Sequence, residues 1–85
     1  QSLGKLFIGE TPKEIFECDL KLELIAIPDL KAAVAYCETV ADYVSRDLFA
    51  SILSSEEEHV DWLETQLGLM ERLGEQNYLQ AQLKS

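Results

Sequence analysis

The stretch Phe49–Leu73, FASILSSEEEHVDWLETQLGLMERL, predicts the fold of this chain. One set of residues within it recurs at alternating steps of three and four, which is the spacing of a helix face that packs in a bundle. The members of this stripe are Phe49, Ile52, Glu56, His59, Leu63, Gln66, Met70 and Leu73. With Asp42 as N-cap and Gly74 as C-terminal cap, we expect a helix from about 42 to 73.

A stripe of the same kind precedes it, formed by Phe16, Leu20, Glu23, Ile27, Leu30, Val34 and Cys37. Thr11 is a good N-cap and Pro12 fits the first helical position, so the sequence predicts a helix from about 12 to 40. The segment CDLKLEL alternates like a strand and Pro28 lacks a backbone donor, but the length favours a helix with a bend or a local 3-10 turn near Pro28.

The turn between the two helices contains no Gly or Pro, so its position can lie two residues either way. The final residues, EQNYLQAQLKS, predict a short third helix from about 76 to 83. The fold class is therefore all-α, a helical hairpin with a short C-terminal helix in one unit. Two long helices cannot cover each other's apolar stripes completely, so partner helices are implied.

The net charge of the chain indicates which classes of ligand it favours and disfavours. Seven basic and sixteen acidic residues among 85 give a formal net charge of -9, which disfavours nucleic acid and favours cations or basic partners. The opening residues QSLGKLFIGETP have no secretory-signal pattern, and no stretch is apolar enough for a membrane span. Cys18 and Cys37 are roughly 28 Å apart along one predicted helix, so they cannot form a disulfide bond with each other. We expect a soluble protein in the reducing cytoplasm.

Three residues of the stripes, Glu23, Glu56 and His59, are expensive to bury unless they are paired or bind a metal. If the turn is centred near residue 40 or 41, an antiparallel hairpin places Glu23 opposite about position 58, between Glu56 and His59. Two carboxylates and one imidazole suit Fe(II), Mn(II) or Zn(II). Glu-x-x-His with single Glu residues from facing helices is typical of di-iron carboxylate bundles, although half of such a ligand set is missing here.

Each of these residues also has a purely structural interpretation. Glu-x-x-His occurs often by chance on exposed helices, and Glu57 and Glu58 fit a solvated face. Met70 and Trp62 fit packing better than chemistry. Neither cysteine has a neighbour that would activate it as a nucleophile.

Three segments carry a family resemblance: ECDLKLELIAIPDLKAAVAYCE, DYVSRDLFASILSSEEEHVDWLETQL and LGEQNYLQAQL. They closely resemble the C-terminal half of bacterioferritin, and LGKLFIGETP resembles the end of the crossover before the third bundle helix. The resemblance implies half of a four-helix, ferritin-like subunit of a 24-subunit cage. Such cages serve iron storage and detoxification, because a di-iron ferroxidase centre oxidises Fe(II) and mineral accumulates inside.

Individual roles follow from the resemblance alone. Glu23 is similar to a terminal carboxylate ligand, Glu56 to a carboxylate that bridges both irons, and His59 to a terminal imidazole ligand. Weaker expectations concern six further positions: Asp61 and Thr65 near a pore, Arg46 and Asp47 at threefold contacts, and Asn77 and Gln80 in a fourfold channel. For these six, ordinary surface or interface chemistry is an equal alternative.

The first two helices of the family are absent from this sequence, and with them the other Glu, the other Glu-x-x-His and the methionine that binds haem b. Met70 does not match that methionine. We therefore expect a companion chain that carries the N-terminal half, produced by cleavage or by a split gene, with ferroxidase activity only in the completed assembly.

Two other interpretations stay open. Two copies of the hairpin could supply four Glu and two His, as in two-helix encapsulated ferritins. The chain could also be a non-catalytic helical structural or interaction subunit, in which the acids of the stripes make buried hydrogen bonds.

Overall fold

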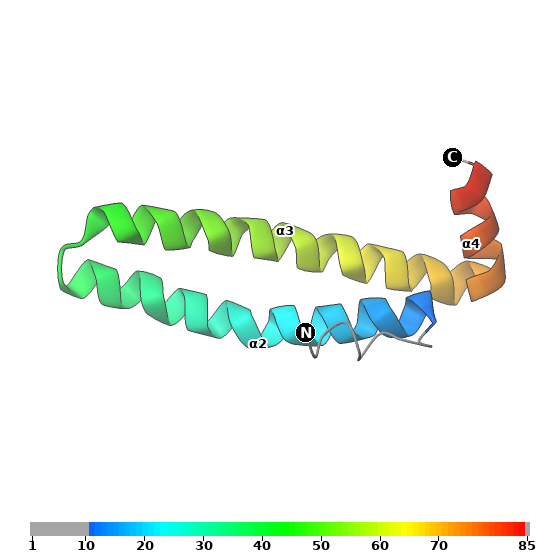
Figure 1. Ribbon diagram of the computed structural model, residues 1–85, viewed down its shortest axis with the longest axis horizontal. Helices are drawn as coiled ribbons and strands as arrows, with labels where there is room; N and C mark the ends of the chain where they lie inside the picture. The colour runs from blue at the N-terminus through cyan, green and yellow to red at the C-terminus, as the bar shows by residue number, and fades with distance from the viewer. Residues whose placement is uncertain (1–10, 85) are drawn as a thin grey trace.

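A computed structural model describes residues 11–84, the side chain of the last of these excepted, and shows three helices in this range. Helix α2 spans Pro12–Thr39, α3 spans Tyr43–Leu73 and α4 spans Glu75–Lys84. Helices α2 and α3 lie side by side as an antiparallel hairpin, and α4 turns away from the end of α3 (Figure 1). The molecule is elongated, with principal extents of 50 × 26 × 19 Å. The all-α fold predicted from the stripes is confirmed. The expected first residue of α2 and last residue of α3 agree with the structure, and the other helix ends differ from the expected ones by one residue.

Helix α2 begins where its capping residues predict. The Thr11 hydroxyl accepts a hydrogen bond from the Glu14 backbone N–H at 3.2 Å, and the Glu14 carboxylate accepts one from the Thr11 N–H at 2.9 Å. This reciprocal capping box satisfies two backbone donors that the helix itself leaves unpaired. We expected a bend or a local 3-10 turn near Pro28. Helix α2 continues through Pro28 as an α-helix, without the 3-10 turn. Pro28 is exposed, so the single backbone bond that it removes lies on the water-facing side of the helix.

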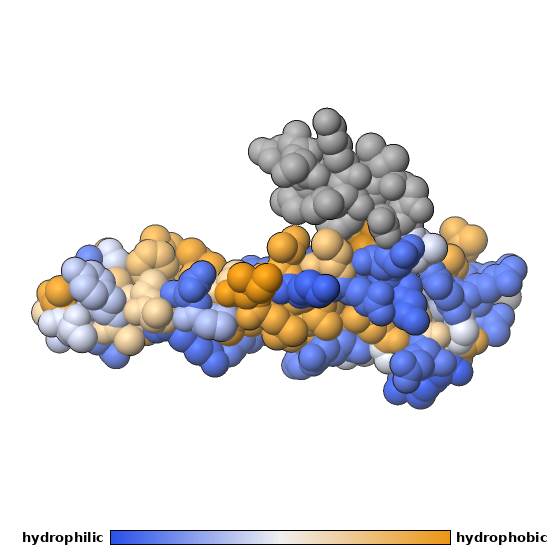
Figure 2. Space-filling view, turned by 90° about the horizontal axis from the view of Figure 1, so that it is seen from below, coloured by the Kyte–Doolittle hydropathy of each residue, from blue (hydrophilic) through white to orange (hydrophobic). Residues whose placement is uncertain are grey.

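The interior of the hairpin is small. Within the described residues, the buried apolar side chains are Cys37, Leu63, Met70 and Tyr78. Cys18 and Cys37 are both free thiols, as their separation along α2 requires. Much of the apolar surface stays outside this core: Leu22, Leu24 and Ile25 on α2 are 40%, 52% and 62% exposed. Figure 2 looks onto the α2 side of the hairpin and shows apolar surface along the middle of this face, between hydrophilic residues.

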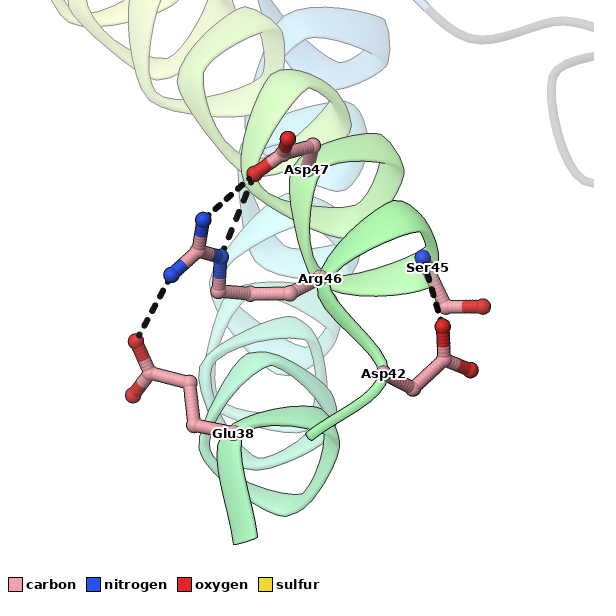
Figure 3. Close-up of polar contacts among 5 residues, drawn as sticks. All are labelled: Glu38, Asp42, Ser45, Arg46 and Asp47. Atoms are coloured by element: carbon pink, nitrogen blue, oxygen red, sulfur yellow. Dashed lines mark hydrogen bonds and ion pairs between the residues drawn. The ribbon is translucent and has the colours of Figure 1, made fainter. Parts of the chain in front are cut away.

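The turn between α2 and α3 is tight despite its lack of glycine. Ala41 adopts a left-handed conformation with φ of 57°. The Asp42 N–H donates to the Cys37 carbonyl at 2.8 Å and the Ala41 N–H to the Glu38 carbonyl at 3.3 Å, which together form a Schellman motif. The Asp42 carboxylate then accepts from the Ser45 N–H at 3.1 Å and caps α3 (Figure 3). A residue with a Cβ therefore occupies a position that usually carries glycine.

Helix α4 is attached to α3 through one buried side chain. Gly74, with φ of 85°, ends α3 and changes the chain direction. Tyr78 is 4% exposed, and its hydroxyl donates to the Gln66 side-chain oxygen at 2.5 Å. Along the described part of the chain, no helix has both the length and the apolar character needed to cross a membrane.

Candidate metal centre

Two helices bring four polar side chains together near the middle of the hairpin. Helix α2 supplies Asp19 and Glu23, which are four residues apart and therefore lie one turn apart on the same face. Helix α3 supplies Glu56 and His59, which are three residues apart and share a face in the same way. All four side chains are half-buried. These four residues are called the acidic–imidazole cluster below.

The most direct contact in the cluster joins the two helices. The Nε2 atom of His59 lies 2.9 Å from Oδ2 of Asp19, and these side chains are 40% and 39% exposed. The hydrogen bond to Asp19 raises the pKa of the His59 imidazole above its usual value, with burial opposing the shift and the charges of Asp19, Glu23 and Glu56 adding to it. The cluster therefore favours the cationic form of His59 when no metal is bound.

A second contact joins Glu23 to Glu56. A hydrogen bond with Glu56, then burial, then the negative charge of Glu56 raise the pKa of Glu23 to about 7, while His59 lowers it. The neighbouring carboxylates of Glu23 and Glu56 repel each other when both are ionised, and either a proton or a cation relieves the repulsion. With a pKa of about 7, the Glu23 carboxyl group is partly protonated near neutral pH.

The ligand atoms of the cluster lie within reach of one ion. One ligand atom each from Asp19, Glu23 and His59 lies within 4.8 Å of the other two. Glu56 adds a second glutamate carboxylate beside Glu23. Carboxylate oxygens with one imidazole nitrogen form a donor set that suits Fe(II), Mn(II) or Zn(II). The chemistry of these side chains therefore fits a divalent metal, whose charge would also neutralise the facing carboxylates.

The structure brings together all three site residues chosen from the sequence, but with a different register. Glu23 lies beside Glu56, two residues before the position expected opposite it, and Asp19 lies beside His59. Sequence analysis missed Asp19 because Leu20 occupies the neighbouring place in the stripe. The signal that could have found Asp19 is its spacing of four residues from Glu23, which places both carboxylates on one face.

Aromatic rings close one side of the cluster. The Trp62 ring stacks on the His59 imidazole with centroids 6.1 Å apart and an interplanar angle of 8°. Phe16 on α2 meets Trp62 edge-on, with centroids 5.4 Å apart and an angle of 68°. Trp62 thus has a packing contact to α2 and a stacking contact to His59.

The residues expected near pores or channels lie outside the cluster. Asp61 and Thr65 are exposed and one turn apart on α3, and Gln80 is exposed on α4. The Asn77 amide donates to the Leu73 carbonyl at 2.9 Å, which holds its side chain against the start of α4.

Arg46 and Asp47 interact with each other at the opposite end of the hairpin. The Arg46 guanidinium donates to the Asp47 carboxylate at 2.9 Å and to the Glu38 carboxylate at 3.4 Å (Figure 3). The guanidinium also lies 5.1 Å from the centre of the Tyr43 ring. Arg46 therefore links the end of α2 to the start of α3.

Comparisons with known proteins agree with the helical pattern. A model of the ferritin-like domain matches residues 2–73, which include all of α2 and α3. The chain is 51% identical over 77 residues to a bacterial ferritin from Synechocystis, and this match covers 89% of the chain and 49% of that relative. It is 47% identical over 78 residues to a bacterioferritin from Rhodobacter capsulatus, covering 92% of the chain and 48% of that relative.

A bacterioferritin from Mycobacterium bovis is 45% identical over 78 residues, covering 92% of the chain and 49% of that relative. The chain therefore spans about half the length of the curated relatives that it matches. The resemblance noted from the sequence alone is confirmed, and it extends over about nine tenths of the chain.

Proposed function

The chain belongs to the ferritin-like domain family, and on that premise we propose that it serves iron storage and detoxification by supplying half of a di-iron ferroxidase centre. Iron is the substrate, and Fe(II) oxidation is the reaction. The completed site would contain Glu23 and His59 as terminal ligands and Glu56 as the carboxylate shared by both irons. The activity belongs to the assembled protein, in which a second hairpin completes the ligand set.

The observation that carries this proposal is the meeting of Glu23, Glu56 and His59 across α2 and α3. A hairpin that needed only apolar contacts would gain nothing from facing carboxylates, because their repulsion raises the pKa of Glu23 to about 7. A divalent cation between them turns this repulsion into attraction. The curated relatives named as bacterioferritins support iron as that cation.

Reduction of O2 or of peroxide at such a centre requires two electrons delivered together. Two Fe(II) ions held by shared carboxylates each give one electron, and with two protons these electrons reduce O2 to H2O2, leaving two Fe(III). With peroxide as the oxidant, the same two electrons and two protons give two water molecules. The carboxylates of Glu23 and Glu56 favour this direction, because anionic oxygen ligands stabilise the ferric charge.

The missing ligands would come from a companion chain that carries the other half of the subunit. The chain spans about half the length of its relatives, and large apolar residues such as Leu24 and Ile25 are more than half exposed. Two further helices packed against the hairpin would bury these exposed apolar residues and complete a four-helix bundle. The same helices would cover the half-exposed side chains of the cluster.

Assembly into a 24-subunit cage with a mineral cavity is the further part of the proposal. In such a cage the exposed residues Asp61 and Thr65 would lie near a route for iron, and Asn77 and Gln80 near a fourfold channel. Arg46 and Asp47 would lie at threefold contacts. Their exposure or half-exposure leaves each of these side chains available to a neighbouring subunit.

Haem b belongs to the proposal only through the relatives. Met70 is 2% exposed and packs inside this chain, so a haem ligand would have to come from the companion chain. Haem content is therefore measured separately, from the absorbance of the purified assembly.

The test is an aerobic Fe(II) titration of the native assembly, with its chain composition determined by mass spectrometry. The rapid ultraviolet change should stop at two irons per complete four-helix unit. If no rapid phase appears in an assembly that contains both halves, the ferroxidase proposal is wrong and the cluster is structural.

Mass spectrometry also separates the alternative assemblies. A second chain of similar size supports the companion. A single species that binds two irons per pair of hairpins supports the homo-oligomer, in which two copies supply all of the ligands. A single species that assembles without oxidising Fe(II) indicates a structural subunit.

A further inference from the structure

We propose that α4 is a hinged arm, with Gly74 as its hinge and the hydrogen bond between Tyr78 and Gln66 as the latch that holds it against α3. Neither residue of the latch belongs to the acidic–imidazole cluster, so this device is independent of the proposed ferroxidase centre. Breaking one side-chain contact would release α4 while α2 and α3 stay paired.

The hinge is a glycine in a backbone conformation that other residues rarely adopt. Gly74 has φ of 85° and ψ of 143°, a region that a Cβ disfavours. A Cβ at Gly74 would meet no atom of the described residues within 4 Å, apart from its chain neighbours, so the space around the hinge is open. Helices α3 and α4 therefore meet at a single residue, with α4 turned away from the hairpin (Figure 1).

The latch is the one buried side chain between residues 75 and 83 of α4. Tyr78 is 4% exposed, and its hydroxyl donates to Oε1 of Gln66 at 2.5 Å. Gln66 is half-buried on α3, about two helical turns before Gly74. The Tyr78 side chain therefore reaches back along α3 and supplies both the burial and the hydrogen bond that hold α4.

A second polar contact lies at the hinge itself. The Asn77 amide donates to the Leu73 carbonyl at 2.9 Å, across the junction of α3 and α4. These residues are only four apart and flank Gly74, so their bond fixes the local bend of the chain. Up to residue 83, every other side chain of α4 is exposed or half-buried. A segment with a single buried residue opens more readily than a hairpin of two long packed helices.

The rival interpretation is that burial of the Tyr78 ring alone holds α4, and that the hydroxyl is incidental. Tyr78→Phe separates the two, because Phe keeps the ring and leaves the Gln66 oxygen without its donor. Loss of one partner leaves a half-buried polar group unsatisfied, whereas replacing both partners by apolar groups can be nearly neutral. If the hydrogen bond is the latch, Tyr78→Phe releases α4, and Gln66→Leu added to it restores the closed arm.

Amide hydrogen exchange of the native assembly, measured by mass spectrometry of its peptides, reports the opening of α4. In the unmodified protein, the amides of α4 should exchange together and faster than those of α2 and α3. In Tyr78→Phe, exchange in α4 should accelerate about 5- to 10-fold, the effect of one lost hydrogen bond, with α2 and α3 unchanged. Tyr43→Phe removes the hydroxyl of a tyrosine that is 55% exposed on α3 and is the matched control.

Two further variants test the hinge and the pairing of the latch. Gly74→Ala introduces no clash but disfavours φ of 85°, so it should accelerate exchange in α4 at least as much as Tyr78→Phe. The double variant of Tyr78→Phe and Gln66→Leu should return exchange in α4 to within about twofold of the unmodified rate. Unchanged exchange in Gly74→Ala means that Gly74 is not the hinge.

Three other outcomes overturn the proposal. Unchanged exchange of α4 in Tyr78→Phe means that the ring alone holds the helix. An equal rise across α2, α3 and α4 means that the contact stabilises the whole fold and that α4 is no separate arm. In the unmodified protein, α4 amides that exchange as slowly as those of α3 contradict an independently opening arm, and this result does not depend on any variant folding.

Discussion

Glu23 on α2 and Glu56 on α3 face each other closely enough that the hydrogen bond and charge of Glu56, together with burial, raise the pKa of Glu23 to about 7. The two carboxyl groups come from different helices and 33 positions apart in the printed sequence. Their repulsion supports the proposed cation site in this part of the hairpin. It also predicts how metal binding depends on pH.

Metal binding is expected to tighten as the pH rises through about 7, where Glu23 loses its proton. The raised pKa means that the metal-free protein holds this proton below pH 7, and a metal ion must displace it. Each displaced proton weakens the apparent affinity by about tenfold for each pH unit below the pKa of its group, and cationic His59 must release a proton as well as Glu23. Calorimetric titration with Co(II) between pH 6 and 8 measures this, and an affinity that does not change with pH contradicts it.

The same pKa shifts predict the stability of the metal-free assembly. Glu23 and His59 both have folded-state pKa values above their ordinary ones, so folding is favoured by their protonated forms. This contribution is complete below the unfolded-state pKa of each group and is lost as the pH rises through the folded-state pKa. Thermal unfolding of the metal-free assembly should therefore have a lower midpoint at pH 8 than at pH 6. A midpoint that rises with pH would argue against the shifts.

Replacing Glu56 by Ala is expected to abolish the rapid phase of Fe(II) oxidation while leaving helicity largely intact. Glu56 is a half-buried helix residue and Ala is a good helix former, so the fold survives while the shared carboxylate is lost. Stopped-flow ultraviolet absorbance and circular dichroism measure the two effects.

Glu57→Ala is the matched control for this variant. Glu57 is the next residue on α3, its side chain is 52% exposed, and it forms an ion pair with Lys31 at 3.9 Å. Exposed pairs of this kind contribute little to stability, so oxidation and helicity should both be unchanged. Normal rapid oxidation by Glu56→Ala would remove the assignment of Glu56 as a shared ligand.

The turn offers a stability test that is independent of metal. Ala41 has φ of 57°, a left-handed conformation that is unfavourable by roughly 1–2 kcal/mol for a residue with a Cβ. Ala41→Gly relieves this strain and should stabilise the protein, partly offset by about 0.4–1 kcal/mol from the greater freedom of glycine in the unfolded chain.

Ala32→Gly provides the comparison, because Ala32 is an exposed residue in the interior of α2. Glycine there should destabilise by about 1 kcal/mol. Denaturant unfolding of the two variants should shift the midpoint in opposite directions, and shifts in the same direction would contradict the left-handed assignment of Ala41.

Pro28→Ala is expected to stabilise α2. Proline in a helix interior removes one backbone hydrogen bond and is unfavourable by about 3 kcal/mol, and Ala restores the donor without adding volume. The gain should be smaller than this because Pro28 also restricts the unfolded chain. Thermal unfolding followed by circular dichroism measures the change. A lower midpoint would mean that the assembly uses the proline ring or the free carbonyl of Leu24.

The sequence by itself determined the helices and most of the cluster. Capping residues such as Thr11, Asp42 and Gly74 mark helix ends through local hydrogen bonds and backbone preferences, so they can be recognised without knowing the fold. The stripes gave Glu23, Glu56 and His59, because residues three or four apart share a face on any helix. For the same reason, the spacing between Glu56 and His59 needed no tertiary information.

Only the tertiary structure decided the register and the place of Asp19. The turn at Ala41 has no glycine to mark it, and the way α2 and α3 pack brings Glu23 beside Glu56 and Asp19 beside His59. A shift of two or three residues along a facing helix changes which side chains meet, and no local preference encodes that shift. In the sequence, nothing distinguishes Asp19 from the other acidic residues of α2. Only the packing of α2 on α3 places its carboxylate 2.9 Å from the His59 imidazole.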